Sequence, residues 1–134
     1  MPRVRDELAA VVAFRSVADD ASLAEDNRDA AEWVRRAFVD AGIPDVALHE
    51  TSDGSLAVVG RRPARDGAPT VLLYSHYDVQ PAGPESAWES DPFELTERGG
   101  RWYGRGAADC KGNLVVHLAA LRAVGDSPVG VVVV

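Results

Sequence analysis

The last residues of this chain constrain its fold more than any other feature. Residues 129–134 read Val-Gly-Val-Val-Val-Val and follow a helical pattern of apolar residues over 109–124. A run of β-branched residues without polar alternation predicts a strand buried on both faces of a parallel sheet. Because a helix that leads into such a strand is typical of β-α-β units, we expect an α/β fold with a mixed, mostly parallel sheet flanked by helices.

The remaining sequence supplies further elements for this fold. Two amphipathic helices are expected near the N-terminus, the second capped by Asp26 or Asn27 and ending at Gly42. Three prolines and a glycine make the stretch 80–92 irregular, and we expect it to form a wall of a cleft. The expected elements are helices over 3–17, 26–41 and 109–124, and strands over 46–51, 55–61, 70–75, 93–97, 101–103 and 129–134.

Composition and charge exclude several classes of protein. The 134 residues are 46% hydrophobic and 26% charged, which is typical of a single globular domain. The net charge of −7, with 14 scattered Lys and Arg residues, argues against a nucleic-acid or membrane-binding surface. No apolar run has the length of a signal peptide or of a membrane span. The single cysteine, Cys110, excludes an internal disulfide and favours a reducing, cytoplasmic setting.

A histidine and an aspartate follow the apolar run 71–74, where a predicted strand ends. His76 and Asp78 are two residues apart, so both side chains project from one face of an extended segment. A carboxylate beside an imidazole fixes the tautomer and orientation of the ring for metal binding or proton transfer. The alternative is a polar strand end that faces water, because a three-residue pattern alone constrains little.

A second candidate residue lies where the third helix begins. Residues 104–112 read GRGAADCKG, and the first half of this segment resembles a phosphate-binding glycine fingerprint. Asp109 replaces the third glycine of that fingerprint, and a carboxylate at a helix N-terminus repels a pyrophosphate. The same position suits a cation ligand, because the positive end of the helix favours an ionised carboxylate. We therefore favour a metal ligand at Asp109 over a nucleotide site.

These candidate residues are expected to meet in space. Ligands of open α/β sheets bind beyond the carboxyl ends of the strands, where His76, Asp78 and Asp109 would converge. A hydrolytic triad that adds Ser75 to the His-x-Asp pair is excluded, because adjacent residues of an extended segment point to opposite faces. The sequence thus predicts a site built around one imidazole and two carboxylates.

Residues 74–114 together resemble a known family. They read YSHYDVQPAGPESAWESDPFELTERGGRWYGRGAADCKGNL and combine His-x-Asp, Trp-x-x-x-Pro-Phe and Tyr-Gly-Arg-Gly-x-x-Asp-x-Lys-Gly in that order. This region resembles the signature of the dinuclear metallopeptidases of family twenty, the group of carnosinases, cytosolic dipeptidases, aminoacylases and glutamate carboxypeptidases. The segment 76–81 is most similar to the dipeptidase branch. Residues 1–134 are then expected to be the N-terminal portion of a zinc-exopeptidase-like catalytic domain.

The resemblance implies roles for individual residues. His76 corresponds to a ligand of one zinc ion, and Asp78 corresponds to the carboxylate that orients this histidine. Asp109 corresponds to a carboxylate that bridges two zinc ions, with manganese or cobalt as alternative metals. A cis peptide bond follows in the family, here Asp109–Cys110. Cys110 itself is expected to be a bystander, with an adventitious metal ligand as the alternative, because its thiol stands beside a zinc site. The resemblance further implies a small peptide or an N-acyl amino acid as substrate, and it allows a homodimer of the complete enzyme.

The resemblance also implies groups that this chain lacks. In the family a general-base Glu and a metal-binding Glu follow the strand that corresponds to residues 129–134, and further ligands come later. Because two bridged metals need more ligands than this chain offers, we expect a truncated chain that binds zinc weakly and is inactive alone. The leading prediction is a zinc-dependent hydrolase of the dipeptidase type. The alternatives are an N-acyl-amino-acid deacylase of the same family and a non-catalytic remnant that acts as a binding domain.

Overall fold

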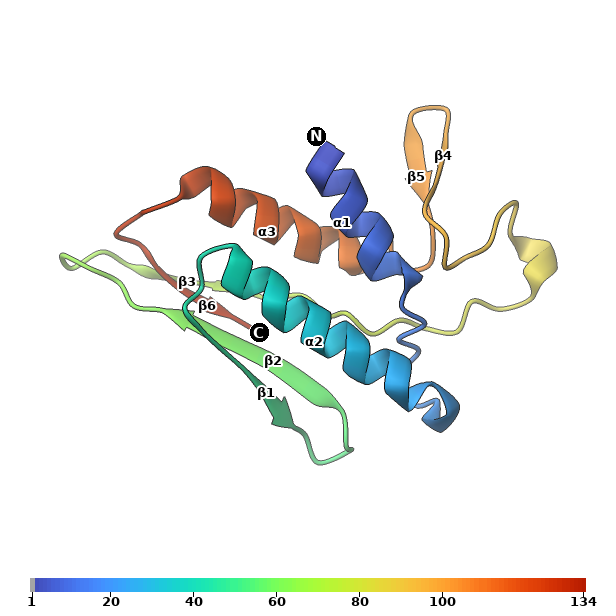
Figure 1. Cartoon of the computed structure of the whole chain (residues 1–134), viewed down its shortest axis with the longest axis horizontal. Coiled ribbons are helices and arrows are strands. Elements are labelled where there is room, and N and C mark those ends of the chain that lie inside the picture. The colour runs from blue at the N-terminus through green and yellow to red at the C-terminus, as the bar shows by residue number, and fades with distance from the viewer. Residues whose placement is uncertain (1) are drawn as a thin grey trace.

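The computed structural model describes residues 2–134 (Figure 1). Within them, three α-helices cover a four-stranded sheet, and a two-stranded hairpin projects from this body. The expected class, an α/β fold with helices on a mixed sheet, is confirmed. The elements are α1 Pro2–Ala13, η1 Ala21–Leu23, α2 Ala24–Asp40, β1 Asp45–Glu50, β2 Leu56–Arg62, β3 Thr70–Leu73, η2 Glu85–Ala87, β4 Thr96–Arg98, β5 Arg101–Tyr103, α3 Lys111–Val124 and β6 Gly130–Val133.

The main sheet has the strand order β1-β2-β6-β3. β1 and β2 form an antiparallel hairpin, β6 pairs antiparallel with β2, and β6 pairs parallel with β3. The expectation of a mostly parallel sheet is therefore wrong for the described strands. A short turn joins β1 to β2 and allows only antiparallel pairing, whereas the connection from β3 to β6 contains α3 and can make a parallel crossover.

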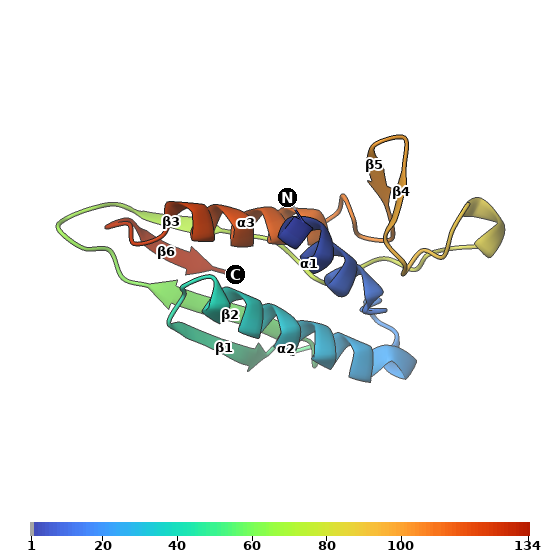
Figure 2. The ribbon, with the colours of Figure 1, turned by 45° about the horizontal axis from the view of Figure 1, so that its top comes forward.

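One face of the sheet carries the core, and the other face is open. On the inner face, Val131 and Val133 of β6 are buried. In contrast, Leu72 of β3 is 65% exposed and Val134 is 44% exposed. The predicted burial of residues 129–134 on both faces holds only in part. β6 is buried at Val131 and Val133, but Val132 is partly exposed, because α1, α2 and α3 pack together on one side of the sheet (Figures 1 and 2).

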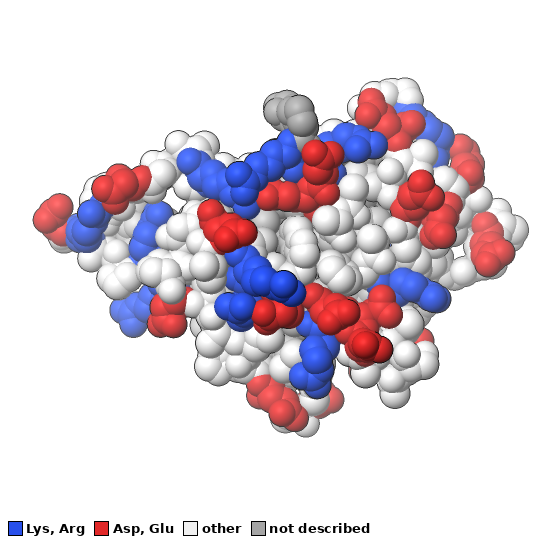
Figure 3. Space-filling model, viewed as in Figure 1, with Lys and Arg blue, Asp and Glu red and all other residues white. Residues whose placement is uncertain are grey.

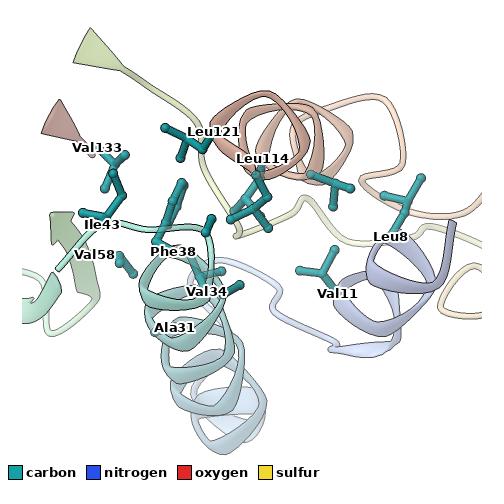
Figure 4. Packing of buried hydrophobic residues seen from close by; sticks show 14 of the residues in the cluster. Leu8, Val11, Ala31, Val34, Phe38, Ile43, Val58, Leu114, Leu121 and Val133 are labelled. Atoms are coloured by element: carbon teal, nitrogen blue, oxygen red, sulfur yellow. The ribbon is translucent and has the colours of Figure 1, made fainter. Parts of the chain in front are cut away.

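The hydrophobic core lies between the three helices and the inner face of the sheet (Figure 4). Phe38 of α2 points toward Leu114 and Leu121 of α3, and Val58 and Val133 close the cluster from the sheet. Each such side chain contributes about 1.5–3 kcal/mol by leaving water. This packing fixes the start of α3 relative to the end of β3, and these are the two places where the candidate site residues lie.

The start of α2 differs from the expectation. The helix begins at Ala24, so neither Asp26 nor Asn27 is its cap. Instead, Asp26 Oδ1 accepts a hydrogen bond from the backbone N–H of Arg15 at 3.0 Å, and Asn27 Nδ2 donates to Val17 O at 3.0 Å. Both polar side chains therefore tie the first turn of α2 to the segment that follows α1, in place of capping their own helix.

Acidic and basic side chains are interspersed on the face shown in Figure 3. This face therefore lacks a continuous basic patch of the kind that binds a phosphate backbone. Among the described helices, none combines the length and the apolarity that crossing a membrane requires.

Candidate metal centre

The segment that carries His76 and Asp78 leaves the sheet at the end of β3. It is held by the residues that follow α1: Val79 N–H donates to Ser16 O at 2.8 Å, and Ser16 Oγ–H donates to Tyr77 O at 2.7 Å. Ser16 is fully buried. Two hydrogen bonds from one buried residue thus fix the backbone on which the candidate ligands stand.

Side chains alternate along this extended segment as the sequence predicts. Tyr77 points inward, where its hydroxyl donates to Leu56 O at 2.6 Å and burial raises the pKa of the phenol. His76 and Asp78 lie on the other face, with His76 Nδ1 at 3.2 Å from Asp78 Oδ1 and 3.0 Å from Asp78 O. The predicted partnership between this imidazole and this carboxylate is present in the structure.

Asp109 reaches the same place from the start of α3. Its Oδ1 lies 3.2 Å from His76 Nε2, and its side chain is 91% exposed. The peptide bond between Asp109 and Cys110 is cis, as the resemblance implied. The structure therefore brings together all three residues that the sequence selected, His76, Asp78 and Asp109.

The donor set fits a metal ion. His76 Nδ1 lies close to two oxygen atoms of Asp78, and Nε2 lies 3.2 Å from Asp109 Oδ1. With the ring proton on Nδ1, Nε2 would present its lone pair toward Asp109 Oδ1, which is the tautomer that binds a metal. In that tautomer a metal ion would bridge His76 Nε2 and Asp109 Oδ1, which lie 3.2 Å apart. Two ligands of a tetrahedral zinc ion, each about 2 Å from the metal, lie roughly 3.3 Å apart.

A buried lysine beneath the site was not found by sequence reasoning. Lys111 has no solvent exposure, and its Nζ donates to Phe14 O at 2.8 Å. Burial lowers the pKa of Lys111 to about 8, against the opposing effect of Asp26 and Asp78. Lys111 belongs to the motif Asp-x-Lys-Gly. The motif does not predict that the lysine is buried, because no local sequence pattern distinguishes a buried lysine from a solvated one.

Cys110 also lies closer to the site than a bystander would. Its sulfur forms a group with one ligand atom of His76 and one of Asp109, and the three atoms lie within 4.8 Å of one another. Among the described residues, this group of His, Cys and acidic side chains is close enough together to hold a metal ion. The adjacency of Cys110 to Asp109 in the sequence is the signal that gave an adventitious metal ligand as the alternative role of this cysteine.

A pocket of about 720 Å³ opens beside these residues. His76 and Asp78 line it together with the loop after α1, the start of α2 and the β1–β2 turn. The stretch 80–92 is irregular as expected, apart from the short η2 turn, but it does not line this pocket. The expectation that it forms a cleft wall is not met at this pocket. Within the stretch, Trp88 Nε1 donates to Ala82 O at 2.9 Å, and the Arg105 guanidinium lies 5.4 Å from the Trp88 ring centroid.

Comparisons with known proteins agree with this geometry. The model of Peptidase family M20/M25/M40 matches residues 72–134. The chain is 45% identical over 125 residues, 93% of its length, to a cysteinylglycine-S-conjugate dipeptidase of Corynebacterium striatum. Over 54 residues, 40% of its length, it is 52% identical to a succinyl-diaminopimelate desuccinylase of Xanthomonas euvesicatoria pv. vesicatoria.

A solved structure extends the similarity to the whole fold. The M20 family metallo-carboxypeptidase Sso-CP2 of Sulfolobus solfataricus superposes on 99% of the chain with a TM-score of 0.85 and 28% identity. The chain spans 27% of the length of the Corynebacterium dipeptidase, 14% of the Xanthomonas desuccinylase and 30% of Sso-CP2. The shared motifs, the matched family model and the common fold lead to one assignment: the chain belongs to peptidase family M20/M25/M40.

Proposed function

We propose that this chain supplies part of the metal site of an amide hydrolase that cleaves dipeptides or other small peptides. The observation that carries the proposal is the approach of two possible ligand atoms, His76 Nε2 and Asp109 Oδ1, to 3.2 Å at the end of a strand. The dipeptidase similarity over 93% of the chain supports a peptide as substrate. Residues 1–134 would then be part of one catalytic domain.

Each of the three residues has a distinct role in this proposal. His76 and Asp109 would hold the metal through Nε2 and Oδ1, and Asp109 would be the carboxylate shared by the two ions that the family resemblance implies. Asp78 would accept a hydrogen bond from the Nδ1–H of His76 and keep the ring in the tautomer that binds metal. Zinc ions bound there, or manganese or cobalt in their place, would polarise the scissile carbonyl and activate water for attack.

Removal of an acyl group from an amino acid is a second candidate function. The local identity of 52% to the desuccinylase favours it, since both reactions cleave an amide with the same kind of metal site. That similarity spans 40% of the chain, whereas the dipeptidase similarity spans 93%. We therefore favour the dipeptidase function and, with it, a small peptide as substrate. We also propose a reducing, cytoplasmic setting, because the single cysteine, Cys110, can form no internal disulfide.

A chimeric enzyme tests the proposal. The matched 125-residue segment of the Corynebacterium dipeptidase is replaced by the corresponding residues of this chain, and hydrolysis of Cys-Gly is measured after zinc loading. We expect activity in the chimera and a loss of at least a hundredfold in H76A and D109A versions, because each removes a proposed ligand. D126N, at an exposed residue paired with Arg65, is the matched control. Full activity of the H76A and D109A chimeras would refute the proposed roles.

The 134-residue chain alone is expected to be inactive. The described residues include one group of side chains that could hold a metal, namely His76, Asp109 and Cys110. Because two bridged ions require more ligands than this group offers, we expect no catalysis. Hydrolysis of Cys-Gly by the purified, zinc-loaded chain, abolished by D109A, would contradict this expectation.

A further inference from the structure

We propose that Asp66 is a modification site: in the folded chain it isomerises spontaneously to isoaspartate, whereas Asp53 is protected. The chain contains two Asp-Gly pairs, Asp53-Gly54 and Asp66-Gly67. Asp-Gly is the sequence most prone to this reaction, because glycine has no Cβ to hinder attack by its backbone nitrogen. The two pairs have the same chemistry in an unfolded chain, so the fold decides which one reacts. The inference goes beyond the proposed function and does not depend on it.

The reaction needs neither an enzyme nor an oxidant. The Gly67 nitrogen attacks Cγ of the protonated Asp66 side chain. An N–Cγ bond forms, the nitrogen loses its proton, and the carboxyl hydroxyl leaves with a proton as water. Water then opens the cyclic succinimide: addition at Cγ restores aspartate, whereas addition at the main-chain carbonyl breaks the bond from that carbonyl to nitrogen and leaves the chain running through Cγ. The water lost in the first step is regained in the second, so the mass does not change.

Asp53 is held by hydrogen bonds that oppose this attack. Its Oδ1 accepts from Thr51 Oγ1 at 2.5 Å and from the backbone N–H of Ser55 at 3.0 Å. The bond from Thr51 lowers the pKa of the Asp53 carboxyl, so less of the carboxyl is protonated. The N–H of Gly54, which would supply the attacking nitrogen, donates to Thr51 O at 2.9 Å. Both reacting groups of this pair are therefore occupied.

Asp66 and Gly67 form the middle of a turn in the connection from β2 to β3, at the far left of Figure 1. Their φ angles are 54° and 73°, and the N–H of Ala68 closes the turn by donating to Arg65 O at 2.9 Å. Within residues 2–134, the hydrogen bonds and ion pairs of this turn involve Arg65 and Ala68, and neither the Asp66 carboxylate nor the Gly67 N–H takes part in one. The two reacting groups are therefore free to approach each other once the turn opens.

Turn formation is the ordinary reason for an Asp-Gly pair with positive φ at both residues. That role accounts for the sequence at Asp66, and it leaves the difference from Asp53 open. Exposure does not separate the two sites, because both aspartates are exposed. The hydrogen bonds of the side chain and of the following N–H separate them, and these are the groups that react.

Isomerisation adds a main-chain carbon to this turn. The neighbouring Arg65 ties the turn to the segment before β6, because its N–H donates to Pro128 O at 2.9 Å and its guanidinium pairs with Asp126. We expect this attachment to loosen in the isoaspartate form. The candidate metal site should be unaffected, since β3 begins at this end of the sheet and His76 follows its other end.

Ageing of the purified chain at neutral pH, in native buffer and in urea, tests the inference. Isoaspartyl methyltransferase with labelled S-adenosylmethionine measures total isoaspartate. Electron-transfer fragmentation of tryptic peptides assigns it to a residue, because Arg61 and Arg65 lie between the two sites. The variants D66E and D53E keep the charge but disfavour the cyclic intermediate, and T51V keeps the shape of Thr51 but removes its hydrogen bond to Asp53. Circular dichroism verifies the fold of each variant.

We expect similar rates at both sites in urea. In native buffer, isoaspartate should form about tenfold faster at Asp66 than at Asp53, because more hydrogen bonds must open at Asp53. D66E should remove most of the native signal, D53E should leave it, and T51V should raise the rate at Asp53. Equal native rates, a faster reaction at Asp53, the same tenfold ratio in urea, or no native isoaspartate would overturn the inference. An unchanged Asp53 rate in T51V would overturn the proposed protection. None of these readouts involves metal binding or hydrolysis, so a failure of the proposed function would be seen separately.

Discussion

His76 Nε2 and Asp109 Oδ1 lie 3.2 Å apart, although 33 positions separate the two residues in the chain. One comes from the end of β3 and the other from the residues before α3. The contact exists because the core holds α3 against the sheet with its N-terminus at the carboxyl end of β3. This is the edge at which ligands bind in open α/β sheets.

Replacement of Asp78 by Asn is expected to weaken zinc binding about 10- to 100-fold while the fold stays intact. The Asp78 carboxylate lies 3.2 Å from His76 Nδ1 and, in the proposed site, fixes the tautomer that leaves Nε2 free for metal. An amide can present its NH₂ group instead and stabilise the wrong tautomer. Chelator competition measures the affinity, with D126N as the control. Equal affinities of D78N and D126N would contradict the orienting role.

Replacement of Ser16 by Ala is expected to lower the free energy of unfolding by about 1–3 kcal/mol. The hydroxyl is buried and donates to Tyr77 O at 2.7 Å, so its removal leaves that carbonyl without its partner. Urea denaturation monitored by circular dichroism measures the change. S22A, at an exposed serine whose hydroxyl bonds the exposed Asp20, should cost less. If S16A and S22A unfold at the same urea concentration, the buried hydrogen bond of Ser16 contributes no more to the free energy of unfolding than the exposed hydrogen bond of Ser22.

Stability of the metal-free chain, measured in EDTA, is expected to increase as the pH rises from about 8 to 10.5. Burial lowers the pKa of Lys111 from 10.5 to about 8, so the unfolded chain binds more protons than the folded chain in this window. The full effect is roughly 3 kcal/mol. The variant K111M, which has no proton to lose, should have a flatter dependence. An identical pH profile in urea denaturation of both chains would show that Lys111 does not titrate as described.

Replacement of Gly112 by Ala is expected to destabilise the chain by about 1–3 kcal/mol. A better helix former would ordinarily stabilise a helix by about 1 kcal/mol. At this position, however, the added Cβ would meet Ala107 O, a backbone atom that cannot move aside cheaply. Thermal unfolding of G112A measures the change, with V116A on the exposed face of α3 as the control. A higher melting temperature for G112A would mean that the loop before α3 relaxes freely.

Local patterns predicted the secondary structure of this chain well. Apolar spacing located the three helices, and the turn around Gly54 located the β1–β2 hairpin, because these features depend on neighbours within a few residues. The alternation of side chains placed His76 and Asp78 on one face for the same reason. The position of Asp109 before a helix marked it as a ligand candidate.

Tertiary structure decided what depends on distant contacts. β2 pairs antiparallel with β6, a contact between segments far apart in the chain. Leu72 is exposed because the helices pack on the other face of the sheet. The burial of Lys111 and the proximity of Cys110 to His76 likewise require the assembled core. The sequence by itself determined which residue types stand at the two chain segments of the site, since motif and periodicity are local. Only the fold decided which donors meet, because separations of a few ångström between residues 33 positions apart are set by long-range packing.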